Sequence, residues 1–102
     1  DGSSVYKFEN LFFDVKKGEI SIKGESKELT RREIQFLEYM FKNKGIIFSR
    51  DQLLNEVWGF DFDGDDRVVD TLVRRVRKKL GEYDFILKTI RGMGYVLDEN
   101  KN

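Results

Sequence analysis

The sequence predicts a small α+β domain in which a short antiparallel β-meander precedes three helices and a C-terminal β-hairpin. Three observations predict this class. Apolar residues alternate at period two near the N-terminus, two capping boxes and an apolar stripe at helical period mark the middle of the chain, and glycines interrupt an apolar stretch near the C-terminus. A chain of 102 residues, 39% of them hydrophobic, is long enough for one hydrophobic core and too short for two.

Short strands are expected near the N-terminus. Phe13 and Val15, and then Ile20 and Ile22, alternate with polar neighbours, which is the pattern of strands with one buried face. Glycine-containing sequences between them supply tight turns. The expected strands and the stub that follows them cover residues 5–9, 11–15, 19–23 and 28–29.

The first helix is expected to begin at a capping box. Thr30 can accept a hydrogen bond from the backbone amide of Glu33, while the Glu33 side chain reaches back to the amide of Thr30. Apolar residues at helical spacing then carry the helix to Lys44. Gly45 is placed to end it in the left-handed conformation.

Two more helices are expected after it. A second capping box, Ser49-Arg50-Asp51-Gln52, begins a shorter helix that is expected to end near Trp58. The third helix is expected to begin near Asp65 or Asp66, whose carboxylates suit the positive end of a helix dipole, and to end at Leu80.

The third helix is strongly amphipathic. At about 100° per residue, its apolar and basic residues fall on opposite sides. The apolar stripe consists of Val69, Leu72, Val73, Val76 and Leu80. The opposite face consists of Arg67, Thr71, Arg74, Arg75 and Lys78, with Arg77 at its edge. We expect the first side to lie in the core and the second to face outward.

A glycine-tipped hairpin is expected to follow the third helix, with residues 85–90 and 95–97 as strands around the turn Arg91-Gly92-Met93-Gly94. The order helix, helix, basic helix, hairpin is the plan of a winged helix-turn-helix. In that plan the third helix enters the major groove of DNA and the hairpin, or wing, reaches an adjacent minor groove. The predicted fold class is therefore α+β, a winged helix-turn-helix with an N-terminal antiparallel β-meander and a C-terminal β-hairpin wing.

The formal net charge is zero, but the charges are unevenly distributed. Residues 1–66 hold ten basic and fourteen acidic side chains, whereas residues 67–91 hold eight basic and three acidic ones. A basic stretch on an otherwise acidic body is typical of a nucleic-acid-binding face. It is equally typical of a solvated helix face, and a basic amphipathic helix can also bind a membrane surface or a partner protein. The membrane alternative is weakened because the apolar side of this helix is narrow, β-branched and needed for the core.

The composition excludes several classes of protein. Cysteine and histidine are absent, which removes disulfides, Cys-type zinc sites and most hydrolase triads. In an EF-hand loop counted from Asp61 the glycine would be sixth, but Gly64 is fourth, so we expect no metal. No apolar run approaches 18 residues, so no membrane span is expected. Neither a cofactor nor an enzymatic activity is expected.

Five ordered segments resemble the DNA-binding effector domain of OmpR/PhoB-type response regulators over nearly the whole chain. Residues 1–4 would be a linker or expression remnant, residues 5–98 the effector domain and residues 99–102 a flexible tail. The segments that carry the resemblance are Leu29-Thr30 with Glu33, Ser49 to Gly59, Asp66 to Asp70, Arg74 to Leu80 and Thr89 to Tyr95.

The resemblance implies sequence-specific binding of double-stranded DNA and a role for individual residues. The residues that would face bases and flanking phosphates in the major groove are Thr71, Arg74, Arg75 and Lys78. The residues that would bind the phosphate backbone are Arg50, Trp58 through its indole, Arg67, Arg77 and Thr89. Arg91 would enter a narrow A·T-rich minor groove. Tyr95 would either touch the backbone or pack the wing, and the sequence leaves both alternatives open.

The resemblance also implies partners and a cellular setting. The domain would be the output half of a bacterial two-component regulator, joined to a receiver domain that a sensor histidine kinase addresses, in the cytoplasm and at the nucleoid. Pairs of domains would bind direct-repeat sites head to tail. The segment Phe60, Asp61, Phe62, Asp63, Gly64, Asp65 and Asp66 corresponds to the loop through which family members contact RNA polymerase. The alternative function is a winged-helix protein-interaction module with a solvated basic face.

Three residues of the third helix depart from, or need explanation within, this pattern. Leu72 stands where many members of the family carry a polar residue, often histidine, and Val68 where threonine is common. The base preference is therefore left open. Asp70 is negative on a helix meant for DNA, and we expect it to orient Arg74 one turn away rather than to accept a hydrogen bond from cytosine.

Overall fold

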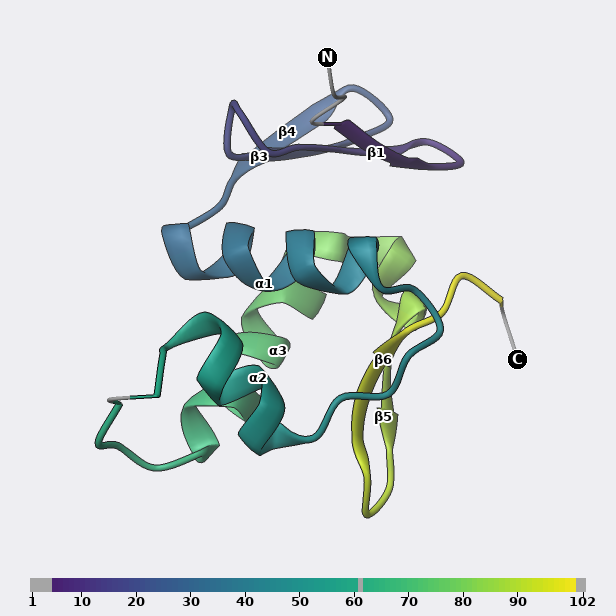
Figure 1. The fold of residues 1–102 in the computed structure, drawn as a ribbon. Coiled ribbons are helices and arrows are strands. Elements are labelled where there is room, and N and C mark those ends of the chain that lie inside the picture. The colour runs from purple at the N-terminus through teal and green to yellow at the C-terminus, as the bar shows by residue number, and fades with distance from the viewer. Residues whose placement is uncertain (1–4, 61, 101–102) are drawn as a thin grey trace.

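The computed structural model describes residues 5–60 and 62–100 and arranges them in three tiers (Figure 1). A four-stranded sheet lies at one end, the helices form the middle, and the C-terminal hairpin projects at the other end. This is the winged helix-turn-helix architecture that the sequence predicts. None of the described helices is long and apolar enough to cross a membrane. Residues 1–4, expected to be a linker, and 101–102 of the expected tail lie outside the described residues.

The N-terminal sheet is an antiparallel meander. Its strands are β1 Val5–Phe8, β2 Leu11–Asp14, β3 Glu19–Ile22 and β4 Glu25–Glu28. The register pairs Tyr6 with Phe13 and Phe13 with Ile20, so these residues share the face that packs on the helices. Phe13 and Ile20 are buried, and the rings of Tyr6 and Phe13 stack with Phe41 of the first helix. Period-two alternation therefore correctly indicated which side of the meander is buried.

Both predicted capping boxes are present, and the helices begin where they indicate. Helix α1 runs over Arg31–Lys42 and helix α2 over Arg50–Val57. Thr30 accepts from the amide of Glu33 at 3.3 Å and Ser49 accepts from the amide of Gln52 at 3.1 Å. The first helix ends two residues earlier than the predicted Lys44. Asn43 occupies the C-cap and its side chain donates to the carbonyl of Tyr39 at 2.8 Å, ending the helix before Gly45.

Helix α3 runs over Arg67–Leu80 and ends at Gly81, as predicted. Asp66 occupies the N-cap position, but its side chain makes no capping hydrogen bond. The carboxylate of Asp65 accepts from the amide of Arg67 at 3.0 Å instead. The residues on its buried side are Val69, Leu72, Val73, Val76 and Leu80, which is the predicted apolar stripe.

The hairpin is shorter than predicted. Residues 85 and 86 belong to the 3-10 helix η1, Gly81–Ile86, so strand β5 covers only Leu87–Ile90 and pairs with β6, Gly94–Leu97. The apolar character of Phe85 and Ile86 reflects packing against the core, which a 3-10 turn satisfies as well as a strand does. Beyond the hairpin, Lys88 donates to the carbonyls of Asp98 and Asn100, which ties the described end of the chain to β5.

A buried ion pair joins α1 to the last turn of α3. Glu33 is only 1% exposed, and its Oε1 accepts from the Nζ of Lys79 at 2.8 Å and from the amide of Thr30 at 2.8 Å. Burial alone would raise the pKa of Glu33, but the hydrogen bonds from Lys79 and Thr30 together lower it. Glu33, which completes the capping box of α1, therefore also fixes α1 against α3.

The base of the wing is fixed to the connector between α1 and α2. Phe48 and Tyr95 exchange two backbone hydrogen bonds of 2.9 Å. Gly94 approaches this connector so closely that a Cβ atom would lie 1.9 Å from the carbonyl oxygen of Phe48, and its φ is +143°. Only glycine satisfies both the conformation and the contact.

We expect Gly94→Ala to lower the free energy of unfolding by at least about 2 kcal/mol more than Gly92→Ala does, because it adds a backbone clash to positive-φ strain. Gly92 is the matched control, since its φ is +78° and nothing lies within 4 Å of its would-be Cβ. Urea denaturation of both variants measures the difference. Equal losses in the two variants would contradict the close approach of the wing to Phe48.

Candidate nucleic-acid interface

The outer face of α3 is exposed and basic. Arg67, Thr71, Arg74, Arg75 and Lys78 all lie on it in the solvent, opposite the buried stripe. Within the described part of the chain, Arg74, Arg75 and Lys78 form no hydrogen bond or ion pair with another residue. Their charges are thus available to a ligand outside the fold. The predicted sidedness of this helix is confirmed.

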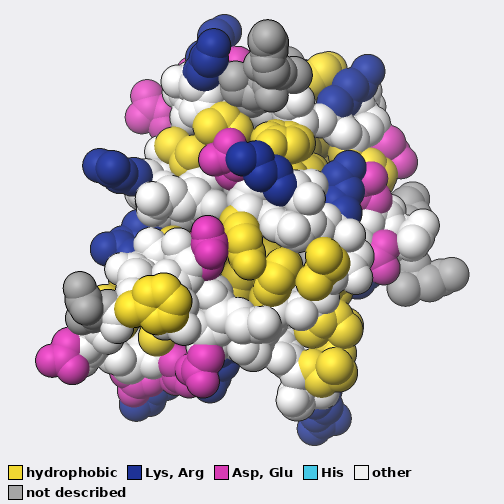
Figure 2. All heavy atoms as spheres, in the orientation of Figure 1, with side chains coloured by type: hydrophobic (Ala, Val, Ile, Leu, Met, Phe, Trp, Pro, Cys, Tyr) yellow, Lys and Arg dark blue, Asp and Glu magenta, His cyan; other side chains and the backbone are white. Residues whose placement is uncertain are grey.

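The hairpin carries a further exposed cation. Arg91 begins the turn between β5 and β6, which closes with a 2.9 Å hydrogen bond from the amide of Met93 to the carbonyl of Ile90. Met93 is 58% exposed beside it. In Figure 2, hydrophobic side chains form a band over the middle of the visible face, and Lys and Arg side chains lie along its lower edge, at the tip of the hairpin and below the helices. Other Lys and Arg side chains lie around the sheet and the upper helices in the same view, so the basic residues are not confined to this edge.

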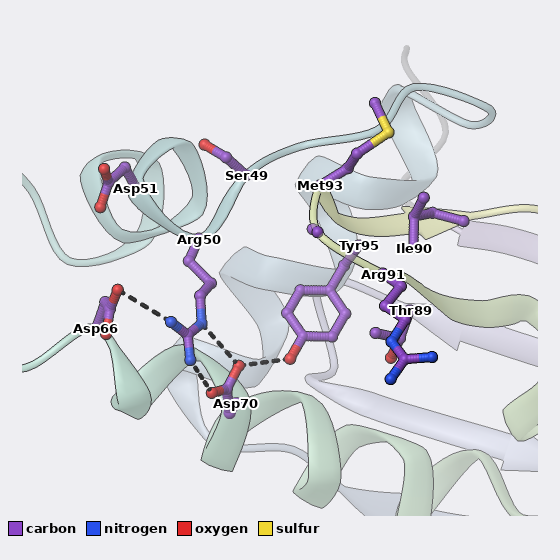
Figure 3. A pocket seen from close by; sticks show the side chains of 12 residues that line it. Ser49, Arg50, Asp51, Asp66, Asp70, Thr89, Ile90, Arg91, Met93 and Tyr95 are labelled. Atoms are coloured by element: carbon purple, nitrogen blue, oxygen red, sulfur yellow. Dashed lines mark hydrogen bonds and ion pairs between the residues drawn. The ribbon is translucent and has the colours of Figure 1, made fainter.

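Arg50 is held by carboxylates of the neighbouring helix. Its Nε and Nη2 donate to the two carboxylate oxygens of Asp70 at 3.2 and 2.7 Å, and its Nη1 donates to Asp66 at 3.2 Å. Figure 3 shows the guanidinium between these two aspartates. The predicted partner of Asp70, Arg74, is thus wrong. The carboxylate orients the arginine that begins α2, which is 20 residues earlier in the sequence.

Asp70 also binds the wing. The hydroxyl of Tyr95 donates to Oδ1 of Asp70 at 2.5 Å, so one carboxylate connects α2, α3 and β6 (Figure 3). The hydrogen bond from Arg50 lowers the pKa of Asp70. In turn, Asp70 and the nearby carboxylate of Asp66 raise the pKa of Arg50. Burial, reinforced by the bond to Asp70, raises the pKa of Tyr95 to about 12. At neutral pH the carboxylate is therefore ionised and the phenol is protonated.

Two further arginines are paired within the protein. Arg67 places Nε and Nη2 on Oδ2 of Asp65 at 3.0 and 2.9 Å, which lowers the pKa of Asp65 to about 2. Arg77 donates from Nε to the carbonyl of Leu87 at 2.9 Å and from Nη2 to Oγ1 of Thr89 at 2.7 Å. These predicted backbone-binding residues already have protein partners, unlike the basic residues in the middle of α3.

Trp58 lies at the C-cap of α2 and is half-buried. The guanidinium of Arg32 lies 4.9 Å from the centroid of the indole, and the ring of Phe62 lies 6.0 Å away. In the loop that follows, Phe60 is 87% exposed, whereas Asp61 lies outside the described residues. The tryptophan is thus part of a small aromatic and cationic cluster at the edge of the helical layer.

A groove of about 550 Å³ separates the beginning of α2 from the wing. Arg50, Asp70 and Tyr95 line it, together with the turn from Thr89 to Gly94 (Figure 3). The sequence singled out Arg50, Thr89, Arg91 and Tyr95 among these residues, but not the network that joins Arg50, Asp70 and Tyr95. The one signal of this network in the sequence is the acidic Asp70 on a basic helix, which indicates that a cationic partner exists but does not identify it.

Comparisons with known proteins agree with this geometry. A profile of the family described as "Transcriptional regulatory protein, C terminal" matches residues 24–97. The chain is 36% identical over 93 residues to the heme response regulator HssR of Staphylococcus epidermidis, covering 89% of the chain and 42% of that protein. It is 45% identical over 87 residues to the uncharacterized transcriptional regulatory protein YclJ of Bacillus subtilis, covering 83% of the chain and 38% of that protein. The chain thus spans about two-fifths of these relatives.

A solved structure has the same fold. The DNA-binding domain of Klebsiella pneumoniae RstA, crystallised in complex with the RstA box, superposes with a TM-score of 0.80 at 30% sequence identity. The match covers 94% of this chain and 98% of that one. The sheet, the three helices and the hairpin therefore recur together in a protein whose structure holds its DNA site.

We expect Asp70→Asn to lower the free energy of unfolding by about 1–2 kcal/mol at pH 7, since it removes the ionic partner of Arg50. The pKa of Asp70 is lowered in the folded protein, so its stabilisation is present above the unfolded-state pKa of about 3.9 and is lost as the pH falls. The difference between wild type and variant should therefore shrink below about pH 4. Urea denaturation at pH 7 and pH 3, with the exposed Asp84→Asn as control, measures it. A difference that is unchanged at pH 3 would contradict the assigned pair.

Proposed function

This chain belongs to the transcriptional regulatory protein C-terminal family, the winged-helix DNA-binding domains of OmpR/PhoB-type response regulators, and on this premise we propose that its α3 binds in the major groove of duplex DNA. The observation that carries the proposal is the outer face of α3, where Arg74, Arg75 and Lys78 have no protein partner among the described residues. An α-helix fits the major groove, and the planar guanidinium can bond two acceptors of guanine at once.

The proposed contacts fall into two groups. Thr71, Arg74, Arg75 and Lys78 face bases and the flanking phosphates, since they are exposed on one side of α3. The second group borders the phosphate backbone and uses donors that are not taken up by partners within the protein; it consists of Arg50, Trp58, Arg67, Arg77 and Thr89. Tyr95 packs the wing instead, because its one O–H donor is bonded to Asp70. Arg50, for example, spends three of its five N–H donors on Asp70 and Asp66.

Arg91 is proposed to enter the adjacent minor groove. It lies exposed in the turn at the end of the wing. A narrow A·T-rich minor groove concentrates negative potential and attracts an arginine side chain. The wing therefore contributes preference for the flanking sequence, while α3 contributes contacts to base edges.

The loop between α2 and α3 is proposed to contact RNA polymerase. Phe60 supports this because a phenylalanine that is 87% exposed is an unusual use of an apolar side chain unless it serves a contact. In the full-length regulator we propose that a receiver domain, phosphorylated by a sensor histidine kinase, controls the effector domain. Two copies would occupy direct-repeat half-sites about one helical turn apart.

We expect Arg74→Ala to weaken duplex binding by about 1–3 kcal/mol, because it removes a contact from the middle of the major-groove face.

Arg91→Ala should reduce the preference for A·T-rich flanks by about 1–3 kcal/mol and leave the preference for the central bases of the site intact. For the wild type, the logarithm of affinity should fall with the logarithm of salt concentration by roughly 0.9 per phosphate neutralised. Fluorescence anisotropy measures all three quantities on a duplex selected from a random pool, prepared with A·T-rich and with G·C-rich flanks.

Lys17→Ala is the matched control, since it removes one exposed cation from the turn between β2 and β3, at the sheet end of the molecule. It should leave the affinity unchanged. Unchanged affinity in the Arg74 and Arg91 variants, with no dependence on salt, would instead favour a winged-helix protein-interaction module whose basic face is only solvated.

A further inference from the structure

The wing is attached to α3 at two points through polar side chains. Asp70 and Arg77 lie on the same side of α3, seven residues and therefore about 10 Å apart along the helix axis. Asp70 contacts β6 through the hydroxyl of Tyr95, and Arg77 contacts β5 through Leu87 and Thr89. One contact would let the hairpin pivot, whereas two contacts on different strands define its angle to the helix.

The first anchor is held from behind. Arg50 bonds both oxygens of the Asp70 carboxylate, so the carboxylate cannot rotate away from Tyr95 without losing an ion pair. Tyr95 is itself 8% exposed, and its backbone is bonded to Phe48 on both sides. The hydroxyl therefore has a fixed position, and the carboxylate that receives it is fixed as well.

The second anchor combines hydrogen bonds with a ring contact. Arg77 donates to the carbonyl of Leu87 at the beginning of β5 and to the hydroxyl of Thr89 further along the strand. Its guanidinium also lies 5.9 Å from the centroid of the Tyr95 ring. Arg77 thus touches both strands of the hairpin and connects the second anchor to the first.

We propose that Asp70, supported by Arg50, and Arg77 are positioning residues that hold the wing at a fixed angle to α3. The exposed cations of α3 and Arg91 at the tip then form one rigid surface, so the spacing between the base-reading helix and the wing is set before DNA arrives. A preorganised surface loses less conformational entropy on binding than a hinged one. The DNA part of this proposal rests on the proposed function, whereas the geometric part is independent of it.

The geometric part is tested with two spin labels. The chain has no cysteine, so labels attached to Met93→Cys in the wing and Lys78→Cys in α3 report a single distance by pulsed electron spin resonance. We expect one narrow distance distribution in the otherwise native protein. Tyr95→Phe, which removes only the hydroxyl of the first anchor, should broaden it, and Tyr95→Phe with Thr89→Val should broaden it further.

Tyr83→Phe is the matched control. Tyr83 is buried to a similar degree, and its hydroxyl accepts a hydrogen bond of 3.3 Å from the amide of Asn10, at the sheet end of the molecule. Removing it costs a buried hydroxyl without touching the wing, so the distribution should stay narrow. A narrow distribution in Tyr95→Phe, or a distribution that is equally broad in Tyr83→Phe, would overturn the proposal.

The DNA part is tested on unlabelled protein by a double-mutant cycle between Tyr95→Phe and Arg91→Ala. If the hydroxyl of Tyr95 positions the wing, the loss of duplex affinity caused by Arg91→Ala should be about fivefold smaller in the Tyr95→Phe background than in the wild type. Additive losses would mean that the hydroxyl acts independently of the wing tip, and would overturn the single-surface claim. Failure of the wild type to bind any duplex would refute the proposed function, while the spin-label distances would still decide the geometric claim.

Discussion

The amphipathic character of α3 is the constraint on which the rest of the structure depends. Val69, Val73 and Val76 are buried on the side of α3 that packs on the core, and the opposite side of the same helix therefore faces solvent. Because that side carries arginine and lysine, the packing of the core also creates the charged surface. Folding thus uses one face of a single 14-residue helix, and the proposed DNA recognition uses the other.

The basic residues of this region divide into two classes by their partners. Arg50, Arg67 and Arg77 are neutralised or satisfied inside the protein, whereas Arg74 and Arg75 have no such partner within the described residues. Carboxylates at the beginning of α3 thereby limit the number of free cations. A chain of zero net charge can in this way present a local positive surface while holding its other cations in structural roles.

Local signals predicted the elements, and long-range pairings were beyond them. The capping boxes at Thr30 and Ser49 and the stripe of α3 depend on residues three or four apart, so the sequence contains all the information that places them. The partnership of Arg50 with Asp70 depends on how α2 crosses α3, and periodicity does not contain that angle. For the same reason the sequence left the role of Tyr95 open and assigned Asp70 to Arg74. The end of α1 and the beginning of β5 were misplaced because Asn43 and the 3-10 turn end those elements through contacts that short patterns do not encode.

The most direct test of the central claim follows the arginine Nε–H resonances of the ¹⁵N-labelled domain during titration with a selected duplex. We expect the side-chain signals of Arg74, Arg75 and Arg91 to shift. The signal of Arg31, at the beginning of α1, should not shift. A shift of the Arg31 signal without shifts of the other three, or binding of the duplex with no shift of the three, would show that nucleic acid binds elsewhere and would contradict this expectation.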